Sequence, residues 1–213
     1  MIASFLISRL RAVTRHRMTK PALWALCLWP LSLLVWRATQ DALGANPAET
    51  LIRSTGDWTL RWLCLTLSVT PLRVSWGWTE LARFRRTLGV CTYAYACLHL
   101  LCYTGFDMDF EVADILHDIA KRPFILVGFS AFVLLTPLAA TSFNAAIRWV
   151  GALRWQRLHK VVYAIAVLAI LHFFWMRAGK HNFADVWLYG SWLSLLLLWR
   201  MRRYVLTRSA RRQ

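Results

Sequence analysis

Six long apolar runs, separated by short polar or charged segments, dominate the pattern of this chain. They cover approximately residues 21–36, 58–72, 86–106, 124–140, 156–176 and 183–201. A helix needs about 20 residues to cross a hydrocarbon core about 30 Å thick, and each run is near that length. The first, second and fourth are short, so we expect tilt or local thinning of the bilayer there. The pattern predicts an all-α integral membrane protein, a bundle of six transmembrane helices.

The first run combines features of a helix and of a signal peptide. It follows a basic segment, but Arg37 and Gln40 stand where a small-residue cleavage motif would lie. We therefore expect a retained first helix. Pro30 lies inside this run, and a proline within a helix is expected to kink it.

Charged residues divide the connecting segments into two kinds. The chain has 26 Lys and Arg against 10 Asp and Glu. The N-terminal segment, the second and fourth loops and the C-terminal tail are rich in Lys and Arg, with Glu80 as their one acid. The first, third and fifth loops carry the other acids. The positive-inside rule then predicts that both termini are cytoplasmic. We expect a basic N-terminal segment (1–20), a transmembrane domain (21–203) and a basic tail (204–213).

Composition narrows the function classes. A net charge of +16 would suit a nucleic-acid-binding protein, but the basic residues are confined to short stretches between apolar runs. The 13 Trp residues suit membrane interfaces. The five cysteines form no CxxC pair, so the signatures of zinc sites and of covalently attached c-type haem are missing. We interpret these cysteines as small buried apolar residues.

The third loop, residues 107–121, has its own pattern. Its apolar positions, among them Phe110, Ile115 and Leu116, favour a short interfacial helix. Its acids would form a face toward the periplasm. This face is either a docking surface for a partner or simply a solvated loop.

Three of the six histidines fall within predicted membrane helices. His16, His117 and His181 lie in loops or termini, whereas His99 is on the third helix and His159 and His172 are on the fifth. An ionisable side chain at membrane depth is costly and indicates a functional site.

Counting along the helices predicts which histidines meet. The third and fifth helices run in the same direction, and His99 lies 13 residues after Arg86, as His172 lies 13 after His159. His99 and His172 should therefore share one depth, where two imidazoles can supply both axial ligands of a b-type haem iron. No acidic residue lies near enough in sequence to favour a zinc or di-iron centre.

His159 should lie about 20 Å from His172 along the helix, near the cytoplasmic surface. It would face Arg85 and Arg86, and arginine is a poor iron ligand because it stays protonated. Either a second haem has His159 on one side and another ligand or none on the other, or Arg85 and Arg86 bind haem propionates or a flavin phosphate. On an ideal helix His159 and His172 are about 140° apart, so a tilt or π-bulge is expected between them.

Two further patterns accompany the histidines. Tyr103 and Tyr163 each follow a histidine by four residues, where they could contact haem edges or propionates, or act as ordinary interfacial tyrosines. Thr-Pro-Leu occurs at 70–72 and at 136–138, each time before a histidine-bearing helix. This recurrence favours a duplicated helix pair.

Several motifs also resemble a known family. They are Trp155-Gln156-Arg157-Leu158-His159 with Tyr163 and His172, Arg85-Arg86-x-Leu88-Gly89 leading to His99, Gly44-Ala45-Asn46-Pro47, and Lys121-Arg122-Pro123. Over roughly residues 21–204 the chain resembles the MsrQ family, formerly YedZ. These are the haem-binding membrane subunits of the periplasmic methionine-sulfoxide reductase system, in the ferric-reductase-like transmembrane superfamily.

The resemblance implies an electron-transfer subunit of a bacterial inner membrane with one or two haem b groups, and FMN as a further cofactor. It implies electrons taken from the quinone pool or a cytoplasmic flavin reductase and passed to MsrP, a periplasmic molybdopterin catalytic subunit that repairs oxidised periplasmic proteins. Relatives in the superfamily hold two haems with two histidines on each of two helices, but here Arg85 stands where the fourth histidine would be.

The resemblance also implies no substrate-reducing site in this chain. Because the chain ends soon after the sixth helix, we expect a separate electron donor rather than a fused flavin domain. Two other functions stay open. One is a ferric or cupric reductase, and the other is a transporter or proton channel gated by its membrane histidines.

Overall fold

The computed structural model describes residues 14–179 and 183–209. His181 and the terminal basic residues Arg9, Arg11, Arg211 and Arg212 lie outside these ranges. Within them the regular structure is entirely helical, as predicted. The helices are α2 (Thr19–Thr39), α3 (Pro47–Ser75), η1 (Thr79–Phe84), α4 (Arg85–Phe106), α5 (Val112–Lys121), α6 (Pro123–Ala140), α7 (Asn144–Val150), α8 (Ala152–Leu158), η2 (His159–Val161), α9 (Val162–Ala178) and α10 (Ala184–Ser209).

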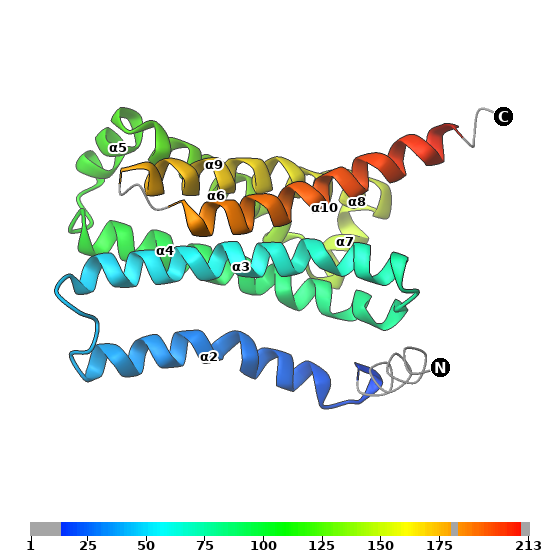
Figure 1. Ribbon diagram of the computed structural model, residues 1–213, viewed down its shortest axis with the longest axis horizontal. Coiled ribbons are helices and arrows are strands. Elements are labelled where there is room, and N and C mark those ends of the chain that lie inside the picture. Colours follow the sequence, from blue (N-terminus) through cyan, green and yellow to red (C-terminus); the bar gives the residue numbers. More distant parts are fainter. Residues whose placement is uncertain (1–13, 180–182, 210–213) are drawn as a thin grey trace.

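The six long helices lie side by side along the length of the molecule (Figure 1). Helices α3 and α4 form one closely packed pair, and α6 and α9 form another. Helix α10 packs on α3 and α9, while α2 packs on the far side against α3 and α4. The main apolar core lies between the two pairs and α10, with Cys64 and Ala166 fully buried.

Three helical segments are long and apolar enough to cross a membrane by length and composition: Thr19–Thr39, Pro123–Ala140 and Ala152–Ala178. Their mean hydropathies are 1.4, 2.0 and 1.9. Helices α3, α4 and α10 coincide with the other three predicted runs but are more polar, since they carry side chains that pair inside the bundle.

Helix α3 begins at Pro47, well before the apolar run predicted to start at Trp58. The Asn46 side chain accepts a hydrogen bond from the Glu49 backbone N–H (3.0 Å), and Pro47 occupies the first turn. Both features favour a helix start. In these added turns Arg53 pairs with Glu49 of the same helix, and Asp57 pairs with Arg177 of α9.

A tyrosine hydroxyl of helix α4 is inserted into the backbone hydrogen bonds of helix α2. The Tyr95 hydroxyl of α4 donates to the Cys27 carbonyl (2.8 Å) and accepts from the Leu31 N–H (3.1 Å). A regular helix would join these two backbone groups directly. The Tyr95 hydroxyl thus stands between the two backbone groups, next to Pro30. A side chain inserted into the backbone hydrogen bonds of a helix is a recognised cause of kinks.

The predicted fifth helix is divided into α8, the 3₁₀ turn η2 and α9. Each residue of a 3₁₀ helix turns the chain by about 120°, whereas each residue of an α-helix turns it by about 100°. The three residues of η2 therefore add about 60° of rotation, and the angle between His159 and His172 around the helix axis falls from about 140° to about 80°. The expected adjustment between the two histidines is therefore present, and it is a 3₁₀ turn rather than a π-bulge.

The ends of the bundle differ in charge. The η1, α7 and α8 segments and the end of α10 lie at one end, where they carry basic residues such as Arg83 and Arg154 (Figure 1). The short helix predicted in the third loop is present as α5 at the opposite end. Its Val112 and Leu116 side chains are exposed, while Asp118 and Ile119 face the bundle. All five cysteines are free and buried or half-buried in the helices.

Candidate functional site

A cavity of about 450 Å³ lies between α3, α4, α6 and α9. His99 of α4 and His172 of α9 both line it. Their ring centroids are 6.2 Å apart and their planes are inclined at 72°. The structure thus brings together the two histidines that residue counting placed at one depth. We call this space the His99–His172 cavity.

Each of these rings is held through its Nδ1 atom by a backbone carbonyl. His99 Nδ1 lies 2.8 Å from the Ile52 oxygen, and His172 Nδ1 lies 2.6 Å from the Phe124 oxygen. A carbonyl oxygen can only accept a hydrogen bond, so both Nδ1 atoms carry the proton. In a neutral imidazole the Nε2 lone pair is then available to a metal. Fixing a ring through the other nitrogen is how proteins orient metal-bound histidine.

The spacing of the rings fits an axial ligand pair. A metal–imidazole bond is about 2 Å long, so two opposite bonds separate the nitrogens by about 4 Å and the ring centroids by about 6 Å. Within the described ranges, no cluster of three or more His, Cys, Asp or Glu side chains is arranged to hold a bare metal ion. Four remaining ligands supplied by a porphyrin would complete such a centre.

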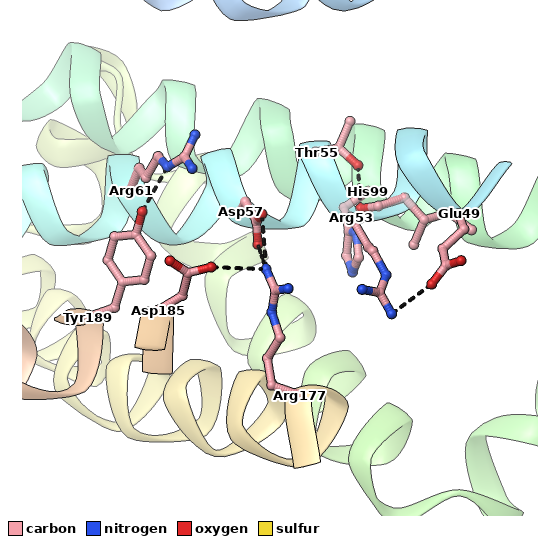
Figure 2. A network of polar contacts seen from close by, with 10 residues as sticks. Glu49, Arg53, Thr55, Asp57, Arg61, His99, Arg177, Asp185 and Tyr189 are labelled. Carbon is pink, nitrogen blue, oxygen red and sulfur yellow. Dashed lines mark hydrogen bonds and ion pairs between the residues drawn. The ribbon is translucent and has the colours of Figure 1, made fainter. Parts of the chain in front are cut away.

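Several charged side chains at or near the cavity have polar partners (Figure 2). Arg177 of α9 lies 3.4 Å from Asp57 of α3 and 3.4 Å from Asp185 of α10, and so ties three helices together. Arg61 donates to the Tyr189 hydroxyl at 2.9 Å. Pairing offsets the cost of placing these charges at membrane depth.

Two more ion pairs stand at the cavity rim near α5. Arg53 bonds to Glu49 at 2.7 Å, and Arg122 bonds to Asp118 at 2.8 Å. Tyr103, a candidate cofactor contact, lines the same cavity. Its hydroxyl donates to Asp118 (2.8 Å), so in this structure its polar atom bonds a carboxylate of α5.

A second cavity of about 270 Å³ lies toward the basic end of the bundle. We call it the His159 cavity. Arginines dominate its polar lining. The chemistry-bearing residues around it are Arg73, Arg85, Arg86, Trp155, His159, Tyr163 and Arg200. No acidic side chain is among the described residues that line it, so this cavity is suited to an anionic group.

His159 is held differently from the other two histidines. Its Nε2 lies 3.2 Å from the Thr141 hydroxyl, and its ring packs on Trp155 with centroids 4.0 Å apart. The Thr141 hydroxyl has one proton and lies 2.7 Å from the Pro137 carbonyl, which can only accept. With its proton donated to that carbonyl, the Thr141 hydroxyl is an acceptor for His159 Nε2–H. The nitrogen that is free in His99 and His172 is occupied in His159.

Sequence reasoning missed Arg200 as a site residue. Its guanidinium bonds the Leu67 and Leu196 carbonyls and lies over the Tyr163 ring, 5.3 Å from the centroid. Its Nε is buried and has no hydrogen-bond partner among the described residues. In the sequence Arg200 looked like one of many basic residues at the end of a helix, so no local signal distinguished it.

Of the remaining histidines, His117 is exposed on α5, and exposed His16 accepts from the Met18 N–H through Nδ1 (3.2 Å). The structure leaves both outside the two cavities.

Comparisons with known proteins identify the family of the chain. Residues 22–170 match the family model of the ferric reductase like transmembrane component. The chain is 63% identical over 186 residues to the protein-methionine-sulfoxide reductase heme-binding subunit MsrQ of Polaromonas naphthalenivorans (strain CJ2), covering 87% of this chain and 85% of that protein.

Identity to the protein of the same name from Herminiimonas arsenicoxydans is 50%, with 85% and 84% of the two chains covered. Identity to that of Bordetella pertussis is 47%, with 91% and 93% covered. No solved structure matches the chain. Because identity is high over most of both chains, the chain belongs to the MsrQ family, within the ferric-reductase-like transmembrane proteins.

Proposed function

We propose that this chain is a membrane electron-transfer subunit that binds haem b between His99 and His172. The observation that carries the proposal is the geometry of this pair, with a 6.2 Å centroid separation and both Nδ1 atoms bonded to carbonyls. The relatives' printed name, heme-binding subunit, supports the same cofactor.

Each part of the cavity has a role in this proposal. Haem supplies reversible one-electron chemistry, while His99 and His172 bind its iron and keep the ring nitrogens oriented. Apolar side chains such as Phe129 and Ile165 line the cavity and exclude water. Arg53 and Arg122 stand at the rim, where guanidinium groups can bind propionates.

The His159 cavity is proposed as a second cofactor site toward the cytoplasmic side. A second haem there would use His159 as a ligand, with Arg85, Arg86 and Tyr163 close to its propionates or edge. The same arginines would suit the phosphate of FMN, the further cofactor implied by the resemblance. Since Thr141 occupies His159 Nε2, we rank this site below the His99–His172 site as a haem site.

Electrons would then cross the inner membrane from the cytoplasmic end of the bundle to the periplasmic end. The quinone pool or a cytoplasmic flavin reductase is the proposed donor, and MsrP is the proposed periplasmic acceptor, for repair of methionine sulfoxide. The printed name of the relatives supports an acceptor in the methionine-sulfoxide reductase system. The basic residues gathered at one end support cytoplasmic termini and six crossings.

Spectra of purified wild-type and variant proteins test the proposal. Wild-type protein should show a six-coordinate b-type spectrum that sharpens on reduction. His99→Ala and His172→Ala should each remove that six-coordinate haem and abolish electron transfer to purified MsrP. His159→Ala should leave the six-coordinate spectrum intact while lowering total haem per protein.

Other outcomes favour the other functions. A wild-type protein that carries no haem when haem is abundant would contradict the proposal, and ion flux into proteoliposomes by such a protein would support a transporter. A haem-loaded protein that reduces a ferric or cupric chelate directly, and not MsrP, would identify a metal reductase.

A further inference from the structure

Each histidine of the His99–His172 cavity packs against a glycine of a neighbouring helix. A Cβ atom added to Gly56 of α3 would lie 3.0 Å from His99 Cε1 and 3.1 Å from its Nδ1. A Cβ atom added to Gly128 of α6 would lie 2.7 Å from His172 Nδ1 and 2.8 Å from its Cε1. These two imidazoles therefore occupy the space that a side chain would take.

The glycine and the carbonyl that holds the ring are spaced identically on the two helices. His99 bonds the carbonyl of Ile52, four residues before Gly56, and His172 bonds that of Phe124, four residues before Gly128. A helical side chain covers the turn on the N-terminal side of its own Cα. A side chain at either glycine would thus cover the carbonyl that the imidazole reaches.

The arrangement recurs in both helix pairs. His99 lies 47 residues after its carbonyl partner, and His172 lies 48 residues after its own. The acceptor on α3 also receives the Thr55 hydroxyl, at 2.9 Å, so the carbonyl next to His99 is fixed by its own helix as well (Figure 2).

We propose that Gly56 and Gly128 are positioning residues that seat the two imidazoles against the Ile52 and Phe124 carbonyls and hold their planes nearly perpendicular. This inference rests on the proposed haem site. The rings are inclined at 72°, and each is confined by a hydrogen bond on one edge and a glycine against its face. A bis-imidazole ferric haem with perpendicular planes gives a highly anisotropic low-spin electron paramagnetic resonance (EPR) signal, whereas parallel planes give a rhombic one.

The wild-type protein alone tests the orientation. Oxidised protein with haem bound should give the highly anisotropic low-spin signal. A rhombic low-spin signal would overturn the inference while leaving the proposed function intact. A protein without bound haem would contradict the proposed function itself, so the two failures are distinguishable.

Alanine variants test the two glycines. Gly128→Ala should lower haem affinity about tenfold, the scale seen when groups supporting a metal ligand are changed, and should alter the EPR signal of the remaining haem. Gly56→Ala should do the same to a smaller degree because its Cβ contacts are longer. Alanine favours helix over glycine, so helix formation itself is not impaired.

Gly190→Ala on α10 is the matched control. Its Cβ would meet only Ile170, at 3.7 Å or more, and Gly190 lines neither cavity. It should keep the wild-type haem content and EPR signal. Wild-type haem affinity and signal in both Gly56→Ala and Gly128→Ala would overturn the positioning role.

Discussion

A histidine ring can act as an iron ligand only through a nitrogen that its surroundings leave free. In His99 and His172 the carbonyl partner takes Nδ1, which leaves Nε2 as the nitrogen with a lone pair, and both residues line the cavity. In His159 the Thr141 hydroxyl takes Nε2 instead. The three histidines thus differ in the atom that they can offer to a metal, a difference that their positions in the sequence do not reveal.

This difference gives a prediction for Thr141→Val. Valine keeps the shape of the side chain but removes the acceptor of the His159 Nε2–H bond. A hydrogen bond of this kind contributes about 1 kcal/mol, so freeing Nε2 should raise haem affinity at the His159 cavity roughly fivefold. Haem titrations of the His99→Ala protein with and without Thr141→Val would measure the change, because His99→Ala removes the other haem site.

Thr136→Val is the control for that titration, because among the described residues the Thr136 hydroxyl bonds only the Phe132 carbonyl of its own helix. Thr136→Val should leave the haem affinities of the His159 cavity and of the His99–His172 cavity unchanged. Lower affinity in Thr141→Val would mean that the Thr141 bond supports ligation through Nδ1 rather than blocking it.

Sequence reasoning reached part of this site. The shared depth of His99 and His172 follows from counting residues on parallel helices, because rise per residue is nearly constant. The roles of Gly56 and Arg200 could not be predicted in this way. These roles depend on which helices are neighbours. A glycine inside a helix, or an arginine at the end of an apolar run, usually occurs for other structural reasons.

At the scale of helices, two helices depart from regular α-helical geometry, and each departure involves an identifiable residue or turn. The bend of α2 at Pro30 is bridged by the Tyr95 hydroxyl, and the break before α9 is the η2 turn that carries His159. Sequence predicted the proline kink because the missing N–H is a local property. It did not predict the 3₁₀ turn, whose residues would also fit a continuous helix.

The bridge in α2 predicts a defined cost for Tyr95→Phe. The ring would still pack against Trp62, but the Cys27 carbonyl and Leu31 N–H would lose their shared partner inside the bundle. Polar contacts between membrane helices contribute about 0.6 to 2 kcal/mol, and we expect a loss in this range. Thermal or denaturant unfolding in detergent would measure it.

The Soret spectrum of Tyr95→Phe should stay that of wild type, since Tyr95 lines neither cavity. Tyr204→Phe, at an exposed position near the end of α10, should cost nothing measurable. Equal stability of both variants and wild type would show that the backbone of α2 closes its own gap.

At the scale of the whole molecule, charge is arranged along the long axis. Arg85 and Arg86 stand where α4 begins and Arg154 is in α8. Helix α5, which carries Asp114 and Asp118, lies at the other end of the bundle (Figure 1). The His159 cavity, rich in arginine, is toward the basic end, and the His99–His172 cavity opens toward α5. If the basic end is cytoplasmic, an electron entering at His159 would leave at the periplasmic surface.

Single cysteines introduced at Glu111 and at Arg154 test this orientation. Both positions are exposed, one beside α5 and the other on α8, whereas the five natural cysteines are buried or half-buried in helices. A membrane-impermeant maleimide should label Glu111→Cys in intact spheroplasts and Arg154→Cys only after lysis. The reverse pattern would place the arginine-rich cavity at the periplasm and contradict the proposed direction of transfer. Labelling of both in intact spheroplasts would contradict a bundle whose two ends lie on opposite sides.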